Sequence, residues 1–309
     1  MPAYLIDASI YIFQAHFSPY VDCQDEDGED LSALYGYTQF LLQFLRREKP
    51  QRIAVAMDES LFCGFRHQLC DKYKSNRELP DENLARQLEA CTVITGLLGL
   101  PAYGSRKYEA DDIIGTLAQR WRKHDSKAGI VIVSRDKDLS QVLQAPNEIV
   151  WDYQGNRKRD ASQIYDELGV RPQQIPDYLG LVGDAVDVIA GVRGVGPVKA
   201  RELLRQFESL DGIYANLDAI ASLPLRGAAK LGQVLEAARD DAYLGKLLAT
   251  IVSDVDDDSE AFSKDPMTKL QRQAVDTQGL AEYMAAQKLP LEVRNRLFAL
   301  ANKLAGAGA

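Results

Sequence analysis

Short β-rich runs alternate with stretches of helical periodicity over the first half of the chain, and this alternation restricts the possible folds more than any other feature. Residues 52–57 and 130–134 are almost continuously apolar, which is typical of strands that are covered on both faces. The sequence therefore predicts an α/β fold with a twisted, mostly parallel sheet and helices on both of its faces. The expected strands are residues 4–6, 52–57, 101–103, 130–134 and 148–151, and the expected helices between them are residues 34–47, 82–98 and 111–123.

The second half of the chain is predicted to form a helical domain. Strand signals fade after residue 172, and helical periodicity covers residues 198–207, 231–248 and 291–304. Residues 63–80 are polar, basic and weakly periodic, so they are expected to form an insertion on the sheet. The predicted domains are residues 1–175 with an insertion at about 60–85, residues 176–290, and a C-terminal helix with a frayed tail at residues 291–309.

Charge and cysteine content exclude several classes of protein. The net charge of −9 argues against a protein that binds polyanions over its whole surface, although it is compatible with a local basic groove. The four cysteines contain no C-x-x-C pair, and no basic segment followed by an apolar stretch opens the chain. The longest uncharged runs have 15 residues, fewer than the roughly 20 that a membrane-spanning helix needs. A reduced, cytoplasmic protein without a membrane segment is therefore expected.

Acidic residues follow the expected strands. Asp7 and Asp58 end the first two, and Asp136 and Asp138 follow the fourth. Because the carboxyl ends of parallel strands meet at one edge of an open sheet, these side chains are expected to line one crevice. Each acid alone is equally compatible with a helix cap or an Asx turn, but capping needs only one acid per helix. Five further acids stand in two short clusters and are Glu109, Asp111, Asp112, Asp184 and Asp187.

Nine carboxylates gathered at one edge indicate a metal site. Like charges within about 4–6 Å of one another disfavour ionisation unless cations neutralise them. Oxygen ligands without His or Cys select Mg²⁺ or Mn²⁺ over zinc, and two such ions can clamp a phosphodiester bond. No G-x-x-x-x-G-K-[ST], H-E-x-x-H or G-x-S-x-G motif is present, which argues against P-loop, metalloprotease and esterase chemistry. Phosphoryl chemistry with two divalent ions is therefore predicted.

A glycine-rich turn at residues 191–197 is the first candidate contact for nucleic acid. It opens a predicted helix, where unpaired backbone N–H groups make a seat for phosphate. A turn of this kind is more often just a loop, but residues 188–204 have the pattern of a helix-hairpin-helix module. A basic balance here suits a duplex backbone that is bound without base readout. The local net charge of +3 comes from Arg193, Lys199, Arg201 and Arg205 against Glu202.

The insertion is the second basic segment. A solvated surface loop would explain its charges. Beside an acidic metal edge, however, its cations can grip phosphate and an aromatic ring can stack on an unpaired base. Residues 65–77 have a local net charge of +3, which comes from Arg66, Lys72, Lys74 and Arg77 against Asp71, and they also contain Phe65 and Tyr73.

Five motifs together resemble the 5′-nuclease family, which comprises the bacterial and phage flap endonucleases and the 5′ to 3′ exonuclease domain of DNA polymerase I. They occur in family order over roughly residues 3 to 290. They are LIDAS at 5–9, Phe65-Arg66 with YKSNR at 73–77, EADD at 109–112, SRDKDLSQ at 134–141, and GLVGDAVDVIAGVRGVG at 180–196.

This resemblance implies a PIN-like nuclease core, a helical arch, and a helix-3-turn-helix that holds duplex DNA and often a K⁺ ion. It places Lys74 and Arg77 at the scissile phosphate as catalytic cations, with Tyr73 as the neighbouring aromatic residue. Asp136 matches the acid that bridges the two metal clusters. The first cluster matches Asp7, Asp58, Glu109, Asp111 and Asp112, and the second matches Asp138, Asp184 and Asp187.

The chain departs from the family pattern at its DNA-binding turn. The family's D-N-I-P-G reads D-V-I-A-G at residues 187–191, and its G-x-K-T-A reads G-P-V-K-A at 196–200, which moves the lysine by one place. Gln14 stands where the family usually has Arg. These changes concern contacts with duplex DNA and K⁺, and they leave the nine acids intact.

The expected function is that of a structure-specific 5′ nuclease, a monomer that acts on DNA with a 5′ flap or a 5′ end at a duplex junction. Two alternatives are a non-catalytic protein that binds DNA junctions and a PIN-type ribonuclease. With 309 residues there is no room for a polymerase, so the sequence fits a stand-alone nuclease or a fragment of a longer chain. The expected DNA contacts are Arg66, Lys72, Tyr73, Lys74, Arg77, Arg193, Gly194, Gly196, Lys199 and Arg201.

Overall fold

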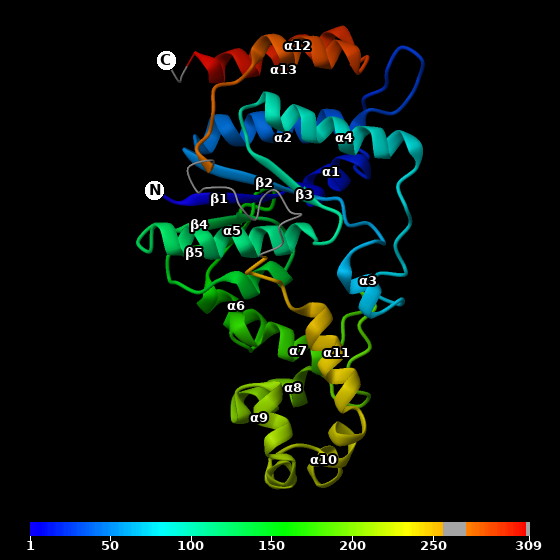
Figure 1. The fold of residues 1–309 in the computed structure, drawn as a ribbon, viewed down its shortest axis with the longest axis vertical. Coiled ribbons are helices and arrows are strands. Elements are labelled where there is room, and N and C mark those ends of the chain that lie inside the picture. The colour runs from blue at the N-terminus through cyan, green and yellow to red at the C-terminus, as the bar shows by residue number, and fades with distance from the viewer. Residues whose placement is uncertain (256–269, 307–309) are drawn as a thin grey trace. The chain divides into compact units, whose positions relative to one another are not determined.

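The computed structural model describes residues 1–255 and 270–306, and Figure 1 shows its ribbon. The chain divides into two compact units whose segments alternate along the sequence. The first unit contains Met1–Leu61, Leu79–Arg135 and Ser253–Ala309, and the second contains Phe62–Glu78 and Asp136–Val252. No helix among the described residues is long and apolar enough to cross a lipid bilayer.

A parallel sheet forms the centre of the first unit. Its strands lie in the order β3-β2-β1-β4, and Leu5 of β1 lies opposite Ala54 of β2 and Ile132 of β4. Nearly all of these strand residues are buried, which explains why their sequences are apolar without alternation. The strands are β1 (Ala3–Asp7), β2 (Arg52–Asp58), β3 (Ala102–Ser105) and β4 (Ile130–Val133).

Helices cover both faces of this sheet, with α2 and α4 on one side of the strands and α5 on the other (Figure 1). The α2 helix buries Leu34, Leu41 and Leu45 along one stripe. The Asp81 carboxylate begins α4 by accepting a hydrogen bond of 2.7 Å from the N–H of Leu84. The helices of this unit are α1 (Ala8–His16), α2 (Ser32–Glu48), α4 (Glu82–Leu97), α5 (Ala110–His124), α12 (Thr277–Ala286) and α13 (Leu291–Ala305).

The last segment of the chain completes the first unit. The Gln273 N–H donates to the Gly99 carbonyl at 2.9 Å, and α12 and α13 pack on α4 and α2. Gly99 has a φ of +74°, and a Cβ atom there would lie 2.4 Å from the Gln273 carbonyl oxygen. The helix predicted at residues 291–304 is confirmed as α13. The predicted frayed tail is residues 305–309, of which Ala305 is the last residue of α13 and residues 307–309 lie outside the described part of the chain.

The second unit is mainly helical. An antiparallel hairpin of β5 (Glu148–Asp152) and β6 (Arg157–Arg159) precedes its helices. The strand β6 was not predicted, because its three basic residues have no apolar pattern. The helices are α3 (Phe65–Leu69), α6 (Ala161–Leu168), α7 (Ile175–Val182), α8 (Pro197–Phe207), α9 (Leu210–Ala215), α10 (Ala228–Ala237) and α11 (Arg239–Ala249), with 3₁₀ helices η1 (Asp138–Val142), η2 (Pro172–Gln174) and η3 (Leu217–Ser222).

One predicted helix is two in the structure. The segment predicted as a single helix at residues 231–248 is broken at Ala238, whose φ of −113° and ψ of 21° are not helical. The Ala238 N–H closes α10 on Leu235, and its carbonyl accepts from Ala242 to start α11. Asp240 and Asp241 then lie in the first turn of α11, where acids favour a helix start. The apolar pattern continues across the break because both helices bury one face.

The expected α/β fold is confirmed. The five predicted strands are present with ends that shift by one or two residues, and the predicted helices of the first half correspond to α2, α4 and α5. The insertion expected to form a helical arch contains one short helix, α3, and turns from residue 71 to 76. The predicted domain boundaries remain a prediction.

Candidate active site

The strand-end acids of the first unit are held by serine hydroxyls. Asp7 ends β1 and is 4% exposed, and its Oδ2 accepts a hydrogen bond of 2.9 Å from Ser134 Oγ. Asp58 ends β2, and its Oδ1 accepts from the Ser60 N–H at 3.1 Å and from Ser60 Oγ at 2.7 Å. These serines help to fix the direction of each carboxylate. Neither serine was predicted as a site residue, although Ser134 lies inside the SRDKDLSQ motif.

A second group of acids in the first unit begins α5. Asp112 is fully buried, and its Oδ2 accepts a hydrogen bond of 3.0 Å from the N–H of Glu109. The two residues form a capping box, so they satisfy backbone groups that a helix start would otherwise leave unpaired. Glu109 is 7% exposed and Asp111 is half-buried. These carboxylates therefore serve the helix as well as any ligand.

The other four predicted acids belong to the second unit. Asp136 Oδ1 accepts from the N–H of Asp138 at 2.8 Å, an Asx turn that leads into η1. Asp184 Oδ1 accepts from the N–H of Val186 at 2.7 Å. Reciprocal backbone hydrogen bonds between Asp184 and Ile189, of 2.9 and 2.7 Å, close a tight loop that carries Asp187. The nine acids are thus divided, five in the first unit and four in the second.

This tight loop has an unusual backbone. Gly183 and Gly191 flank it with φ of +78° and +64°, and a Cβ atom on Gly191 would lie 2.3 Å from the backbone nitrogen of Gly183. Both positions therefore require glycine. Val188 also has a positive φ, of 59°, which is strained for a β-branched residue. Of the two residues that depart from the family's D-N-I-P-G motif, Val188 is therefore also the strained one.

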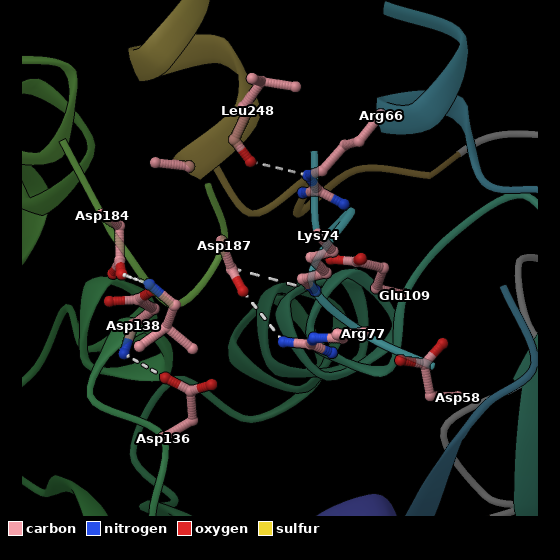
Figure 2. A network of polar contacts seen from close by, with 12 residues as sticks. Asp58, Arg66, Lys74, Arg77, Glu109, Asp136, Asp138, Asp184, Asp187 and Leu248 are labelled. Carbon is pink, nitrogen blue, oxygen red and sulfur yellow. Dashed lines mark hydrogen bonds and ion pairs between the residues drawn. The ribbon is translucent and has the colours of Figure 1, made fainter. Parts of the chain in front are cut away.

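Cationic side chains contact two acids of the second unit. Lys137 Nζ lies 2.8 Å from Asp184 Oδ2. Arg77 Nη2 lies 2.9 Å from Asp187 Oδ1, and Lys74 Nζ lies 3.9 Å from Asp187 Oδ2. Figure 2 shows Arg77 and Lys74 joined by dashed lines to the same carboxylate. The backbone N–H of Lys74 also donates to the Asp187 carbonyl at 3.0 Å, which fixes this end of the insertion to the loop.

Asp138 is the least satisfied of these acids. Its Oδ1 is buried and has no hydrogen-bond partner. Burial, followed by repulsion from Asp136, raises the pKa of Asp138 to about 7, although Lys137 opposes the shift. Asp184 behaves in the opposite way: burial alone would raise its pKa, but the hydrogen bond from Lys137 and those from backbone N–H groups lower it. Within the cluster of Asp136, Asp138, Asp184 and Asp187, the negative charge of Asp138 is therefore only partly compensated.

The donor set fits a hard divalent cation. All nine predicted ligands offer carboxylate oxygen, which suits Mg²⁺ or Mn²⁺. Across residues 1–255 and 270–306, no three His, Cys, Asp or Glu side chains already have the arrangement that would hold a metal ion. In the second unit, the unpartnered Asp138 oxygen and the excess charge are the features that a bound cation would satisfy.

Three of the predicted DNA contacts, Arg66, Tyr73 and Lys74, are buried in the second unit, and Lys74 is 8% exposed. Arg66 is 3% exposed, and its guanidinium donates to the carbonyls of Leu248 at 2.8 Å and Thr250 at 2.7 Å, at the end of α11. Tyr73 is 2% exposed and packs with Leu248 and Ile189. These contacts attach the insertion to α11 and to the tight loop that carries Asp187. Contact of Arg66 or Tyr73 with DNA remains a prediction, whereas Lys72 is exposed.

The glycine turn before α8 is open to solvent. Gly194 and Gly196 are exposed, and a Cβ atom on either would meet nothing within 4 Å. Arg193 is exposed beside them. Lys199 Nζ donates to the Gly194 carbonyl at 2.8 Å, and Arg201 Nε donates to the Leu168 carbonyl at 2.6 Å. The backbone of the turn is thus accessible, while these last two side chains have partners within the unit.

Comparison with known proteins gives a consistent result. Residues 2–172 match the family model "5'-3' exonuclease, N-terminal resolvase-like domain", and residues 170–277 match "5'-3' exonuclease, C-terminal SAM fold". DNA polymerase I of Pseudomonas aeruginosa is 36% identical over 260 residues, which cover 84% of this chain and 28% of the polymerase. The chain therefore spans less than a third of that relative's length.

Two further comparisons cover nearly whole proteins. The 5'-3' exonuclease of Buchnera aphidicola is 29% identical over 254 residues, which cover 82% of this chain and 87% of that enzyme. Among solved structures, the flap endonuclease of bacteriophage T5, in a pseudo-enzyme-product complex with DNA and metal ions, matches with a TM-score of 0.62 and 17% identity, over 99% of this chain and 100% of that one. This structural match shows a shared fold.

Proposed function

The chain belongs to the 5'-3' exonuclease family, and we propose that it is a structure-specific 5′ nuclease that hydrolyses DNA phosphodiester bonds at junctions of single strand and duplex. One observation carries the proposal. Arg77 and Lys74 both contact the carboxylate of Asp187, at 2.9 and 3.9 Å. The carboxylate is a proposed ligand of a metal ion. Cations beside it are therefore well placed to bind a phosphate group that lies between them and the ion.

Two divalent ions complete the proposed site. We assign Mg²⁺ or Mn²⁺, because every candidate ligand is a carboxylate. When bound, two such ions would supply a hydroxide from bound water and would stabilise the leaving oxygen. The proposed ligands are Asp7, Asp58, Glu109, Asp111 and Asp112 in the first unit, and Asp136, Asp138, Asp184 and Asp187 in the second.

The chain's own residues orient the ligands and the substrate. Ser134 and Ser60 direct the carboxylates of Asp7 and Asp58. Arg77 offers a planar fork of donors to phosphate, whereas Lys74 offers a point charge. Arg77 is 43% exposed, so its guanidinium is accessible to substrate.

The glycine turn and the start of α8 are the proposed seat of the duplex backbone. Exposed backbone N–H groups at a helix N-terminus attract phosphate, and they do so without reading base sequence. The turn is also the place where the family resemblance puts K⁺. The proposed contacts are Arg193, Gly194, Gly196, Lys199 and Arg201, together with Lys72 of the insertion.

Relatives support these assignments. The T5 flap endonuclease structure contains DNA and metal ions, and the Buchnera relative is named as a 5'-3' exonuclease. The match covers 28% of DNA polymerase I, and the proposal concerns the nuclease chemistry of this matched part. We further propose that it acts as a cytoplasmic monomer.

Cleavage of a labelled 5′-flap duplex tests the proposal. With Mg²⁺ or Mn²⁺, the wild-type protein is expected to release the flap at the junction, and Asp136→Ala is expected to lose activity by roughly 10³-fold or more, because metals contribute several kcal/mol to such reactions. The Asp136→Ala variant should bind the flap at least as tightly as wild type, since it removes negative charge near phosphate. Asp166→Ala, an exposed acid on α6, is the matched control and should cleave normally.

A matched RNA flap completes the experiment. Equal or faster cleavage of RNA would assign the chain to the ribonuclease class instead. An intact DNA flap with every divalent ion, despite tight binding of the junction, would show a binding protein without nuclease activity.

A further inference from the structure

Lys137 makes the shortest contact between a cation and a proposed metal ligand in the second unit, among the contacts described above. Its Nζ lies 2.8 Å from Asp184 Oδ2, within hydrogen-bond distance. The two side chains differ in freedom, because Lys137 is 48% exposed whereas Asp184 is 5% exposed. The carboxylate is therefore fixed in place, and the ammonium group reaches it from solvent.

The surroundings of Lys137 are acidic. Asp136 and Asp138 flank it in the chain, and Asp136, Asp138 and Asp184 all favour its charged form. One ammonium group thus sits among three of the four carboxylates to which we assign a divalent ion. A cation in this position lowers the negative potential that attracts a second cation.

Lys137 is not needed to hold Asp184. Asp184 Oδ1 keeps its hydrogen bond from the Val186 N–H, and the backbone of Asp184 is paired with Ile189 on both sides. Removing the ammonium group would leave the carboxylate in the same loop with one oxygen, Oδ2, freed for another ligand. The contact therefore balances charge more than it supports the fold.

A divalent ion and an ammonium group compete for Asp184 Oδ2. Two cations that share one carboxylate oxygen repel each other strongly, so metal binding at this oxygen has to displace the lysine. Displacement is easy, because a half-exposed lysine can swing into water, where its charge is well solvated.

We propose that Lys137 is a resident counter-cation of the second acidic cluster, which occupies Asp184 in the metal-free protein and thereby lowers the affinity of this cluster for its divalent ion. The proposal rests on the function proposed above. Lys137 is in this view a residue that sets metal affinity, distinct from Lys74 and Arg77, which contact Asp187 and are assigned to phosphate. It shifts loading of the second cluster to a higher metal concentration than the ligands alone would require.

Equilibrium binding of Mn²⁺ to the full chain without DNA tests this role, with free Mn²⁺ followed by electron paramagnetic resonance. Lys137→Met and Lys137→Gln are expected to bind Mn²⁺ about tenfold more tightly at one class of site, because each removes a positive charge close to the ion. Lys137→Arg keeps the charge and should bind as wild type does. Lys230→Met changes an exposed lysine on α10 and serves as the matched control, with no change expected.

A double-mutant cycle with Asp184→Asn locates the effect. If Lys137 acts through Asp184, the gain from Lys137→Met should largely disappear in the Asp184→Asn background, which a general change in charge would not produce. Without metal, Lys137→Met should also unfold at a lower temperature than wild type, and Mn²⁺ should raise its melting temperature by more.

The possible outcomes separate the two proposals. Unchanged or weaker Mn²⁺ binding by both neutral variants, while wild type binds Mn²⁺, would overturn the role of Lys137 and leave the proposed nuclease standing. If Lys137→Met raised the affinity for Mn²⁺ by the same factor in the Asp184→Asn background, the proposed competition at Asp184 would be overturned. No Mn²⁺ binding by wild type or by any variant would overturn the metal-dependent function, and with it this inference.

Discussion

The acids of the first unit and those of the second are satisfied by different partners. In the first unit, Asp7 is held by a serine hydroxyl, and Asp112 by the backbone N–H of Glu109. In the second unit, Asp184 and Asp187 are contacted by lysine and arginine, and Asp138 keeps a buried oxygen without a partner. Among these contacts, only the second unit has charged donors, and there they add to backbone N–H groups that donate to Asp136 and Asp184.

This difference teaches that carboxylates proposed as metal ligands can have opposite effects on stability. An acid that caps a helix stabilises the native state whether or not a ligand is present. An acid buried among like charges destabilises it until a cation arrives. Substitutions of Asp112 and Asp138 should therefore change stability in opposite directions even where they have the same effect on catalysis.

The largest effect is expected for Asp138→Asn. This substitution should lower cleavage of a 5′ flap by roughly 10³-fold, because it removes a proposed metal ligand. In EDTA, the same variant should be more stable than wild type by on the order of 1 kcal/mol, because it removes a charge that burial and Asp136 disfavour. Flap cleavage and urea unfolding of the same preparations measure both changes.

The pH dependence sharpens this test. Since the pKa of Asp138 is raised to about 7, the metal-free native state holds a proton that the unfolded chain releases near pH about 4. Native stability should therefore fall as the pH rises from about 4 to about 7, and Asp138→Asn should reduce this slope. If Asp138→Asn left the dependence of stability on pH unchanged, or made the protein less stable in EDTA, the charge of Asp138 would not be unfavourable in the metal-free protein.

Gly191→Ala should have the next largest effect. A Cβ atom would lie 2.3 Å from the backbone nitrogen of Gly183, and φ is +64°. Because a backbone atom cannot move aside, we expect a loss of about 3 kcal/mol in the free energy of unfolding. Gly194→Ala, with φ of +86° and nothing within 4 Å, is the matched control and should cost only about 1 kcal/mol. Equal losses in urea titrations would mean that strain alone, and not the close approach, decides the result.

Asp112→Ala tests the first unit. The variant leaves the buried N–H of Glu109 without its acceptor and removes the capping box, so it should lose about 2 kcal/mol of stability with or without metal. The sign is opposite to that expected for Asp138→Asn in EDTA. A stabilised Asp112→Ala protein in the same unfolding assay would erase the contrast between the two units.

The smallest expected effect is a gain in stability. Val188→Asn should stabilise the protein by about 1 kcal/mol, because asparagine tolerates a positive φ that strains valine, here 59°. Val188→Ile, which stays β-branched, should bring no gain. The melting temperatures of the two variants, measured side by side, separate relief of backbone strain from a change in packing.

The sequence was sufficient for those features that depend on local pattern. Apolar runs located the strands of the first unit, and the strand ends located Asp7 and Asp58, because both follow from periodicity and the geometry of parallel sheets. The break at Ala238 was not predictable in this way, since both helices around it keep one apolar face. The strand β6 was too short and too basic to show a pattern.

The partners of the site residues were not predictable, because they come together only in three dimensions. Ser134 and Lys137 lie within the SRDKDLSQ motif, whose acids were predicted as metal ligands. Their own roles depend on Asp7 and Asp184, which are distant in sequence. Arg66 and Tyr73 show the converse. Their basic and aromatic character predicted exposed contacts with DNA, whereas tertiary packing places them against α11.

The return of the chain to the first unit has a consequence for biosynthesis. The surfaces of α2 and α4 that α13 and α12 cover are made early during translation, but their covering helices leave the ribosome only after every residue of the second unit has been made. The nascent first unit must therefore expose apolar surface while the second unit can already fold, and that surface is where a chaperone would be expected to bind.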